Sequence, residues 1–170
     1  EYAYQMDGPA DQARGLLFNR KHTLLDPYAK AVTGQRNWGE KPEGGKDFVY
    51  KARVVQSDFD WGRYRNLNYK FEDLVIYEMH VRGFTKDASS GVKGGGTFEG
   101  LRQKIPYLKD LGINAVELMP IFEFDEMESA RVVDGVQLYN YWGYNTVSFF
   151  APNTSYAFHQ EHNHEGDELK

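Results

Sequence analysis

The chain has 170 residues, of which 41% are hydrophobic and 26% charged, a soluble globular composition that excludes a disordered or fibrous protein. The 20 basic and 25 acidic residues give a net charge of -5, the wrong sign for a general nucleic-acid binder. The longest mostly apolar stretch, 113–124, is interrupted by polar residues and falls far short of the roughly 20 residues that span a bilayer. We therefore expect neither nucleic acid nor membrane as a partner.

The absence of cysteine suits a reducing compartment, and we expect a cytoplasmic location. The first residues carry no basic or apolar targeting signature, which is consistent with a start inside a longer protein.

The first 70 residues predict little regular structure. Residues 1–6 alternate with a period of two and predict a strand. Residues 10–34 show no regular pattern and are interpreted as a non-helical segment that packs as it crosses the molecule. Glycines, a proline and charges over 34–46 predict a surface loop or linker with a domain boundary, and 57–71 is interpreted as connecting structure.

A strand–helix–strand unit is predicted next. The near-continuous apolar run 74–81 predicts a strand buried on both faces. Thr97 is a candidate N-cap for a helix that continues to residue 111, with a kink or restart near Lys104 or Ile105 because Pro106 lacks a backbone donor. Residues 113–119 then predict a second strand, parallel to the first.

The remaining chain predicts a long polar loop over 122–140, a short apolar piece at 147–150 and a helix start at 165–170. Acidic residues in the long loop could supply a carboxylate pair for acid–base chemistry, but a charge run on a loop is more often solvated. They are Glu123, Asp125, Glu126 and Glu128. The histidines at 159, 162 and 164 match no usual zinc spacing, so a solvated loop is favoured over a metal site.

Four aromatic rings fall within six residues, 139–144, at the mouth of the expected sheet. Core packing could account for one or two of them. So many rings with polar tips also suit stacking on the apolar face of a pyranose, with hydroxyls left to orient the sugar.

Three segments together identify a resemblance. Residues 77–85 (YEMHVRGFT), 114–120 (NAVELMP) and 141–145 (YWGYN) resemble, in order and spacing, the start of the catalytic barrel in isoamylase-type and glycogen debranching enzymes of the α-amylase superfamily. Upstream, 4–9 and 25–30 look like the last strand and exit segment of the β-sandwich glycan-binding module that precedes this barrel. The resemblance extends to about residue 157.

The resemblance implies an α/β fold class, the opening part of a (β/α)8 (TIM) barrel preceded by the end of a β-sandwich. Residues 1–34 would be the end of the glycan-binding module, 35–70 a linker, and 71–170 the first units of an incomplete barrel. A full barrel needs about 250 residues, so length points the same way.

The implied activity is hydrolysis of α-1,6 branch points in glycogen, starch or amylopectin, with retention. The family places its three catalytic carboxylates on later barrel strands, so no catalytic residue is assigned here and the chain alone is expected to be inactive. Tyr144 matches the tyrosine that stacks under the glucose next to the scissile bond, and Trp142 is its neighbour.

No cofactor is expected from the resemblance except, in some isoamylases, calcium. Glu123 would correspond to one ligand, whereas Asn153 stands where another is aspartate, so calcium stays open. Glu78, His80 and Arg82 are expected to form buried hydrogen bonds under the site.

Two other functions stay open. The chain could serve as a non-catalytic α-glucan-binding module, or its parent could act on another linkage, as an α-1,4-acting amylase or a branching-type relative does.

Overall fold

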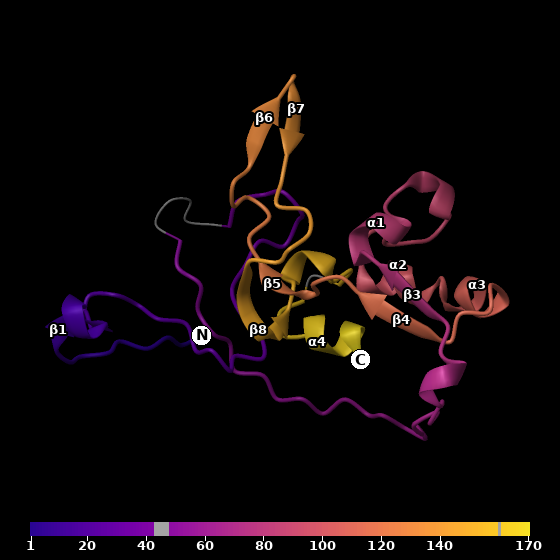
Figure 1. The fold of residues 1–170 in the computed structure, drawn as a ribbon, viewed down its shortest axis with the longest axis horizontal. Helices are drawn as coiled ribbons and strands as arrows, with labels where there is room; N and C mark the ends of the chain where they lie inside the picture. Colours follow the sequence, from indigo (N-terminus) through magenta and orange to yellow (C-terminus); the bar gives the residue numbers. More distant parts are fainter. Residues whose placement is uncertain (43–47, 160) are drawn as a thin grey trace.

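A computed structural model describes residues 1–42, 48–159 and 161–170 (Figure 1). The first 70 residues run mostly as extended chain, with one small hairpin formed by β1 (Ala10–Asp11) and β2 (Leu16–Leu17). The strand predicted over 1–6 is wrong, because Tyr2 and Tyr4 form only single bridges. Their partners, Ala52 and Leu24, lie on different segments, so no continuous ladder can form.

The predicted strand–helix–strand unit is confirmed. Strands β3 and β4 pair in parallel, with Ile76 opposite Ala115 and Met79 opposite Leu118. Between them lie three short α-helices and one 3-10 helix, Ala88–Ser90. The bounds are β3 Ile76–Met79, α1 Val81–Thr85, α2 Phe98–Arg102, α3 Ile105–Asp110 and β4 Ala115–Leu118.

Local sequence signals set the ends of these helices. The side chain of Thr97 accepts a hydrogen bond from the Gly100 N–H and caps α2 as predicted. The helix then restarts at Ile105, with Pro106 in the first turn of α3, where its missing N–H has no intrahelical acceptor to lose. Gly112 follows α3 with φ 89°, the left-handed geometry that ends many helices.

The expectation that 74–81 is a strand buried on both faces is wrong. The strand begins only at Ile76, which is half exposed, as is Val75. At its other end His80 caps α1, so Val81 is helical. Strand β3 has one neighbour, β4, and among the described residues only Met79 of this strand is buried.

The predicted polar loop over 122–140 is also wrong, because it contains three strands. Strand β5 pairs antiparallel with β8, and β6 pairs with β7 in a hairpin that projects from the molecule (Figure 1). Asp134 and Gly135 turn the hairpin with positive φ at both positions, as a tight turn of this kind requires. The bounds are β5 Phe122–Phe124, β6 Arg131–Val133, β7 Val136–Leu138 and β8 Thr146–Pro152.

Two buried clusters form the core, and both join segments that are distant in sequence. One contains Ala29, Val32, Ala52 and Ala151. The other contains Val81, Phe98, Phe124 and Tyr156, with Trp38 packed against it.

Trp38 comes from the segment 34–46 that was predicted to be a surface loop, and Gln35 of that segment is buried. The prediction is therefore wrong for these two residues, while 43–46 lies outside the described residues. Because the core includes residues from this polar segment, it cannot be recognised from local hydrophobicity.

The predicted helix start at the end of the chain is confirmed as α4 (Glu165–Leu169), which packs near β8 (Figure 1). In the described parts of the chain, every helix is too short or too polar to cross a membrane.

Candidate functional site at the aromatic loop

The aromatic loop, residues 139–145, joins β7 to β8 and is tied to the end of β3. His80, the residue after β3, lies with Nε2 2.8 Å from the carbonyl oxygen of Tyr141, and its Nδ1 accepts from the Gly83 N–H at 3.1 Å. Because Nδ1 accepts, the ring proton is on Nε2, which donates to Tyr141. Burial lowers the pKa of His80, which favours this neutral form. The loop thus lies at the carboxyl end of β3, the edge at which parallel sheets present ligand-binding loops.

Two alternate residues of the loop, Tyr141 and Gly143, contact neighbouring elements, although Tyr141 is still 41% exposed. The ring of Tyr141 stacks on His80 with centroids 4.1 Å apart and planes 8° from parallel. Gly83 leaves room for it, since a Cβ at that position would lie 2.3 Å from the Tyr141 hydroxyl. Gly143 has φ 79°, and a Cβ there would lie 2.5 Å from the Phe124 ring. Only glycine fits this position.

The residues between and after these anchors face solvent. Trp142 is 62% exposed and Tyr144 65% exposed. Their rings meet edge to face with centroids 6.3 Å apart. Aromatic rings that are held outward by an anchored backbone lose little conformational entropy when they bind an apolar face.

Trp38 packs beneath the loop, and no sequence pattern indicated this role. Its ring stacks on Tyr156 at 5.9 Å and meets Tyr141 edge-on at the same distance. The guanidinium of Arg82 lies 4.7 Å from the centre of the Trp38 ring. A single tryptophan among glycines and charges has no periodicity that could have revealed this contact.

The expected buried hydrogen bonding under the site is confirmed for His80. It is wrong for Glu78, which is exposed because nothing in the described chain covers that face of β3. Arg82 is half-buried against Trp38 instead.

Two acidic residues that were predicted to be solvated are completely buried. Glu123 and Glu126 have no exposed surface. The pairing of β5 with β8 shifts register on both sides of Glu123, and this bulge turns Glu123 and Phe124 inward together. Burial raises the pKa of both carboxyl groups, that of Glu126 to about 7.

Hydrogen bonds satisfy one oxygen of each buried carboxyl. Glu123 Oε2 accepts from the Thr154 N–H at 2.9 Å, and Glu126 Oε1 accepts from the Ser155 hydroxyl and from the Asn153 amide. Within the described residues, the other oxygens, Glu123 Oε1 and Glu126 Oε2, have no hydrogen-bond partner.

Calcium takes six to eight oxygen ligands. The buried carboxyl groups of Glu123 and Glu126 offer only two unpartnered oxygens, so the described residues do not fit a calcium site. Asn153 adds none in this arrangement, because its Oδ1 accepts from the Ser155 N–H at 2.9 Å. No group of three or more acidic, histidine or cysteine side chains among the described residues is placed to hold a metal ion.

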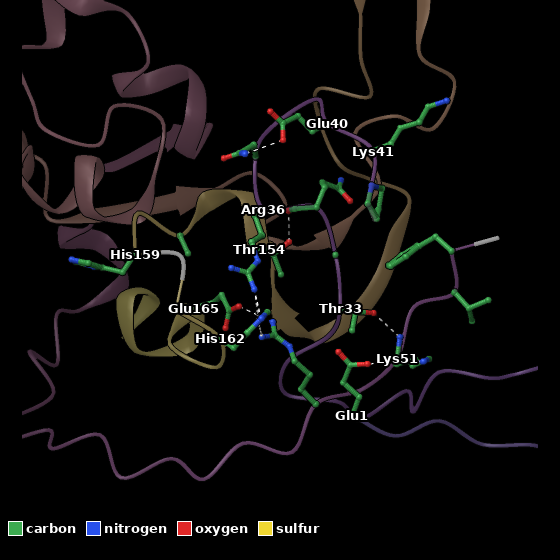
Figure 2. A pocket seen from close by; sticks show the side chains of 18 of the residues that line it. Glu1, Thr33, Arg36, Glu40, Lys41, Lys51, Thr154, His159, His162 and Glu165 are labelled. Atoms are coloured by element: carbon green, nitrogen blue, oxygen red, sulfur yellow. Dashed lines mark hydrogen bonds and ion pairs between the residues drawn. The ribbon is translucent and has the colours of Figure 1, made fainter. Parts of the chain in front are cut away.

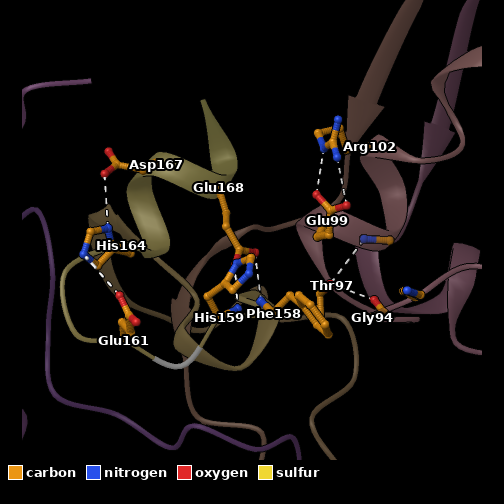
Figure 3. Close-up of polar contacts among 12 residues, drawn as sticks. Gly94, Thr97, Glu99, Arg102, Phe158, His159, Glu161, His164, Asp167 and Glu168 are labelled. Atoms are coloured by element: carbon orange, nitrogen blue, oxygen red, sulfur yellow. Dashed lines mark hydrogen bonds and ion pairs between the residues drawn. The ribbon is translucent and has the colours of Figure 1, made fainter. Parts of the chain in front are cut away.

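The three histidines near the C-terminus lie apart and have separate partners. His159 bonds to Glu168, and His164 lies between Glu161 and Asp167 (Figure 3). His162 contacts Arg36 and Arg53 at a hollow of about 790 Å³ (Figure 2). In that hollow Arg53 pairs with Glu165 at 2.7 Å, so basic and acidic groups are mixed along its wall.

The chain was compared with known proteins. It is 45% identical over 160 residues to "Isoamylase 3, chloroplastic" of Oryza sativa subsp. japonica, an alignment that covers 92% of this chain and 20% of the relative. It is 35% identical over 177 residues to "Glycogen debranching enzyme" of Yersinia enterocolitica, covering 94% of this chain and 26% of the relative. The chain is homologous to isoamylases and glycogen debranching enzymes. No protein-family model matches it.

Solved structures are also similar to this debranching-enzyme homologue. A pullulanase from Anoxybacillus sp. LM18-11, complexed with maltotetraose, superposes with a TM-score of 0.64 and 28% identity, over 86% of this chain and 21% of the pullulanase. The predicted resemblance and a mixed α/β fold are thereby confirmed. The chain spans about a fifth of the length of the first curated relatives it matches.

Proposed function

We propose that this chain is the opening part of an isoamylase-type glycoside hydrolase that cleaves α-1,6-glucosidic branch points of glycogen or starch with retention. The observation that carries the proposal is the anchored loop that presents Trp142 and Tyr144 at the carboxyl end of β3. The names of its relatives, isoamylase and glycogen debranching enzyme, support it. In this role Tyr144 stacks beneath the glucose next to the scissile bond, and Trp142 lies beside it.

The domain arrangement belongs to the same proposal. Residues 71–170 begin a (β/α)8 barrel, 1–34 end a β-sandwich glycan-binding module, and 35–70 connect the two. The exposed surface supports this, since it measures 12072 Å², whereas a compact monomer of this mass exposes about 8,600 Å². The exposed face of β3 is the place where further barrel strands would pack.

This chain contributes binding and positioning, and no catalytic residue. Retaining hydrolysis needs two carboxyl groups about 5 Å apart that flank the scissile bond. Glu123 and Glu126 cannot serve, because they are sealed from solvent behind the loop. We place the nucleophile, the acid and the stabilising aspartate on barrel strands that follow residue 170.

Calcium, which the resemblance left open, is not part of the proposal. Glu123 and Glu126 are fully buried, and no group of three or more acidic, histidine or cysteine side chains among the described residues is placed to hold a metal ion.

The test is debranching of glycogen by the complete protein. We expect reducing ends to be released, and we expect none from residues 1–170 alone. Tyr144→Ala lowers kcat/KM at least about tenfold, as loss of a central aromatic contact does. Tyr64→Ala is the matched control, because Tyr64 is 68% exposed and lies outside the loop. Equal effects of the two variants would contradict the role of Tyr144.

A non-catalytic glucan-binding module is the second candidate, favoured by one observation. The rings of Trp142 and Tyr144 are exposed, whereas the carboxyl groups of Glu123 and Glu126 are completely buried. If the complete protein binds immobilised glycogen in a Tyr144-dependent way but releases no sugar, this candidate replaces the first. Products with new α-1,4 ends or new branches would instead indicate an amylase or a branching relative.

The cellular location stays a prediction. The relative from rice is named chloroplastic, so a cytoplasmic location does not follow from the homology.

A further inference from the structure

A second hollow, of about 700 Å³, lies between the aromatic loop and the β6–β7 hairpin. Its volume is in the range of small-molecule binding sites. Rings of the loop, Tyr139 and Trp142 among them, form one wall, and Arg131, Gln137 and Leu138 of the hairpin form the other. Tyr144 is not part of this hollow, but its ring touches that of Trp142 edge to face. Trp142 therefore connects the hollow to the proposed glucose site.

We propose that this hollow is a subsite for the α-glucan chain beyond the glucose unit that Tyr144 holds, and that the β6–β7 hairpin is its outer wall. The proposal rests on the proposed function and adds to it a determinant of chain-length preference.

The chemistry of the wall fits an oligosaccharide. A glucose unit has apolar faces, which suit aromatic rings, and an edge of neighbouring hydroxyls, which suit planar groups with several donors or acceptors. The guanidinium of Arg131 makes no hydrogen bond or ion pair with the described residues. The amide nitrogen of Gln137 donates to the carbonyl oxygens of Arg131 and Leu138, which leaves its side-chain oxygen to accept from a ligand.

The hairpin has no other evident structural role. Val132 and Val136 are 64% and 61% exposed, and no residue of the hairpin belongs to either core cluster. An isolated two-stranded ribbon is marginally stable in water, so a ribbon that packs on no core needs a function to explain it. Its polar residues Arg131 and Gln137 line the hollow, whereas Val136 does not.

The experiment measures binding of maltotriose and maltoheptaose to the complete protein by calorimetry. In one variant a Gly-Gly link replaces residues 131–138, which is feasible because Arg131 and Leu138 are a paired position with Cα atoms about 5 Å apart. The point variant Arg131→Ala keeps the hairpin. Val136→Thr is the matched control, since it changes the ribbon outside the hollow.

We expect the wild-type protein to bind maltoheptaose more tightly than maltotriose. In the protein without the hairpin and in Arg131→Ala, the ratio of the affinity for maltoheptaose to that for maltotriose falls by about tenfold, the effect of losing a charged hydrogen bond. Affinity for maltotriose stays within about twofold, and Val136→Thr behaves as wild type.

An unchanged ratio in both variants overturns this inference and leaves the proposed function intact. Failure of the wild-type protein to bind either sugar overturns both. If the variants change the oligomeric state without changing sugar affinity, the inference is overturned too. The hairpin would then contact another protein chain.

Discussion

The β3–β4 unit differs in burial from the region formed by residues 122–126, β8 and the 3-10 turn Thr154–Tyr156 that follows β8. In the first, strand residues such as Ile76 and Val116 are about half exposed. In the second, Phe124, Glu126 and Tyr156 are completely buried.

The difference shows that regular secondary structure and core formation are located in different parts of this chain. The parallel unit has clear local signals, yet Ile76 and Val116 of its strands are about half exposed. The buried region is made of short strands and turns whose partners, such as Trp38 and Val32, come from far away in sequence. Four predictions test this comparison.

The largest expected effect is at Tyr156, in the centre of the buried region. Tyr156→Ala removes a ring that contacts Trp38, Phe98 and Phe124. The free energy of unfolding should fall by about 3–5 kcal/mol, as in other large-to-small core substitutions. Denaturant unfolding of the complete protein measures it. Tyr64→Ala is the exposed control and should change stability by less than about 0.5 kcal/mol; similar values for the two would contradict the buried cluster.

The next effect is the pH dependence set by Glu126. Burial raises its pKa from 4.5 to about 7. Between these pH values Glu126 is protonated in the folded protein and ionised in the unfolded chain. The free energy of unfolding is therefore highest below about pH 4.5 and decreases as the pH rises through about 7. Glu126→Gln should remove this loss and stabilise the protein at about pH 8, by on the order of 3 kcal/mol.

The Glu126 measurement is unfolding against pH in a chelator, with exposed Glu161→Gln as control. Parallel stability curves for wild type and Glu126→Gln in chelator would show that Glu126 is not buried as described.

A third prediction concerns the exposed face of β3. In the complete protein, Ile76→Ala should cost about 2 kcal/mol, because the proposed barrel strands would bury this side chain. Val54→Ala, at a position that is 70% exposed outside the strand pair, is the control. A cost below about 0.5 kcal/mol for Ile76→Ala, the range of surface substitutions, would contradict the proposed barrel.

The smallest expected effect separates two costs of replacing a glycine in the aromatic loop. One is backbone strain at positive φ, and the other is overlap of the new Cβ with a neighbouring ring. Gly143 and Gly112 both have positive φ, 79° and 89°, but only Gly143 faces a neighbouring ring. Gly143→Ala should therefore destabilise by about 1 kcal/mol more than Gly112→Ala. It should also weaken maltotriose binding, since Trp142 and Tyr144 flank it. Equal effects of the two variants on stability and on binding would show that Phe124 does not anchor the loop.

Much of the fold could be predicted wherever a local signal was sufficient. Thr97, Pro106 and Gly112 fix helix ends through their own backbone and side-chain chemistry, and those predictions are confirmed. The candidate rings, Trp142 and Tyr144, were also identified from sequence, and their role stays a prediction.

The failures at the buried residues share one physical cause. Glu123, Glu126, Gln35 and Trp38 are polar or isolated in sequence, and only long-range packing buries them. A run of charged residues in a loop is normally exposed to solvent. Here a β-bulge and a turn distant in sequence bury it, and neither feature produces a periodic sequence pattern.

The sequence by itself determined the parallel strand–helix–strand unit, its caps and the aromatic loop, because these depend on neighbours within a few residues or on a recognisable motif. Only the tertiary structure decided how the loop is held, because His80 and Gly83 contact Tyr141, and Phe124 packs against Gly143, from other elements. It also decided that two carboxyl groups lie in the interior, since burial depends on what the rest of the chain places around them.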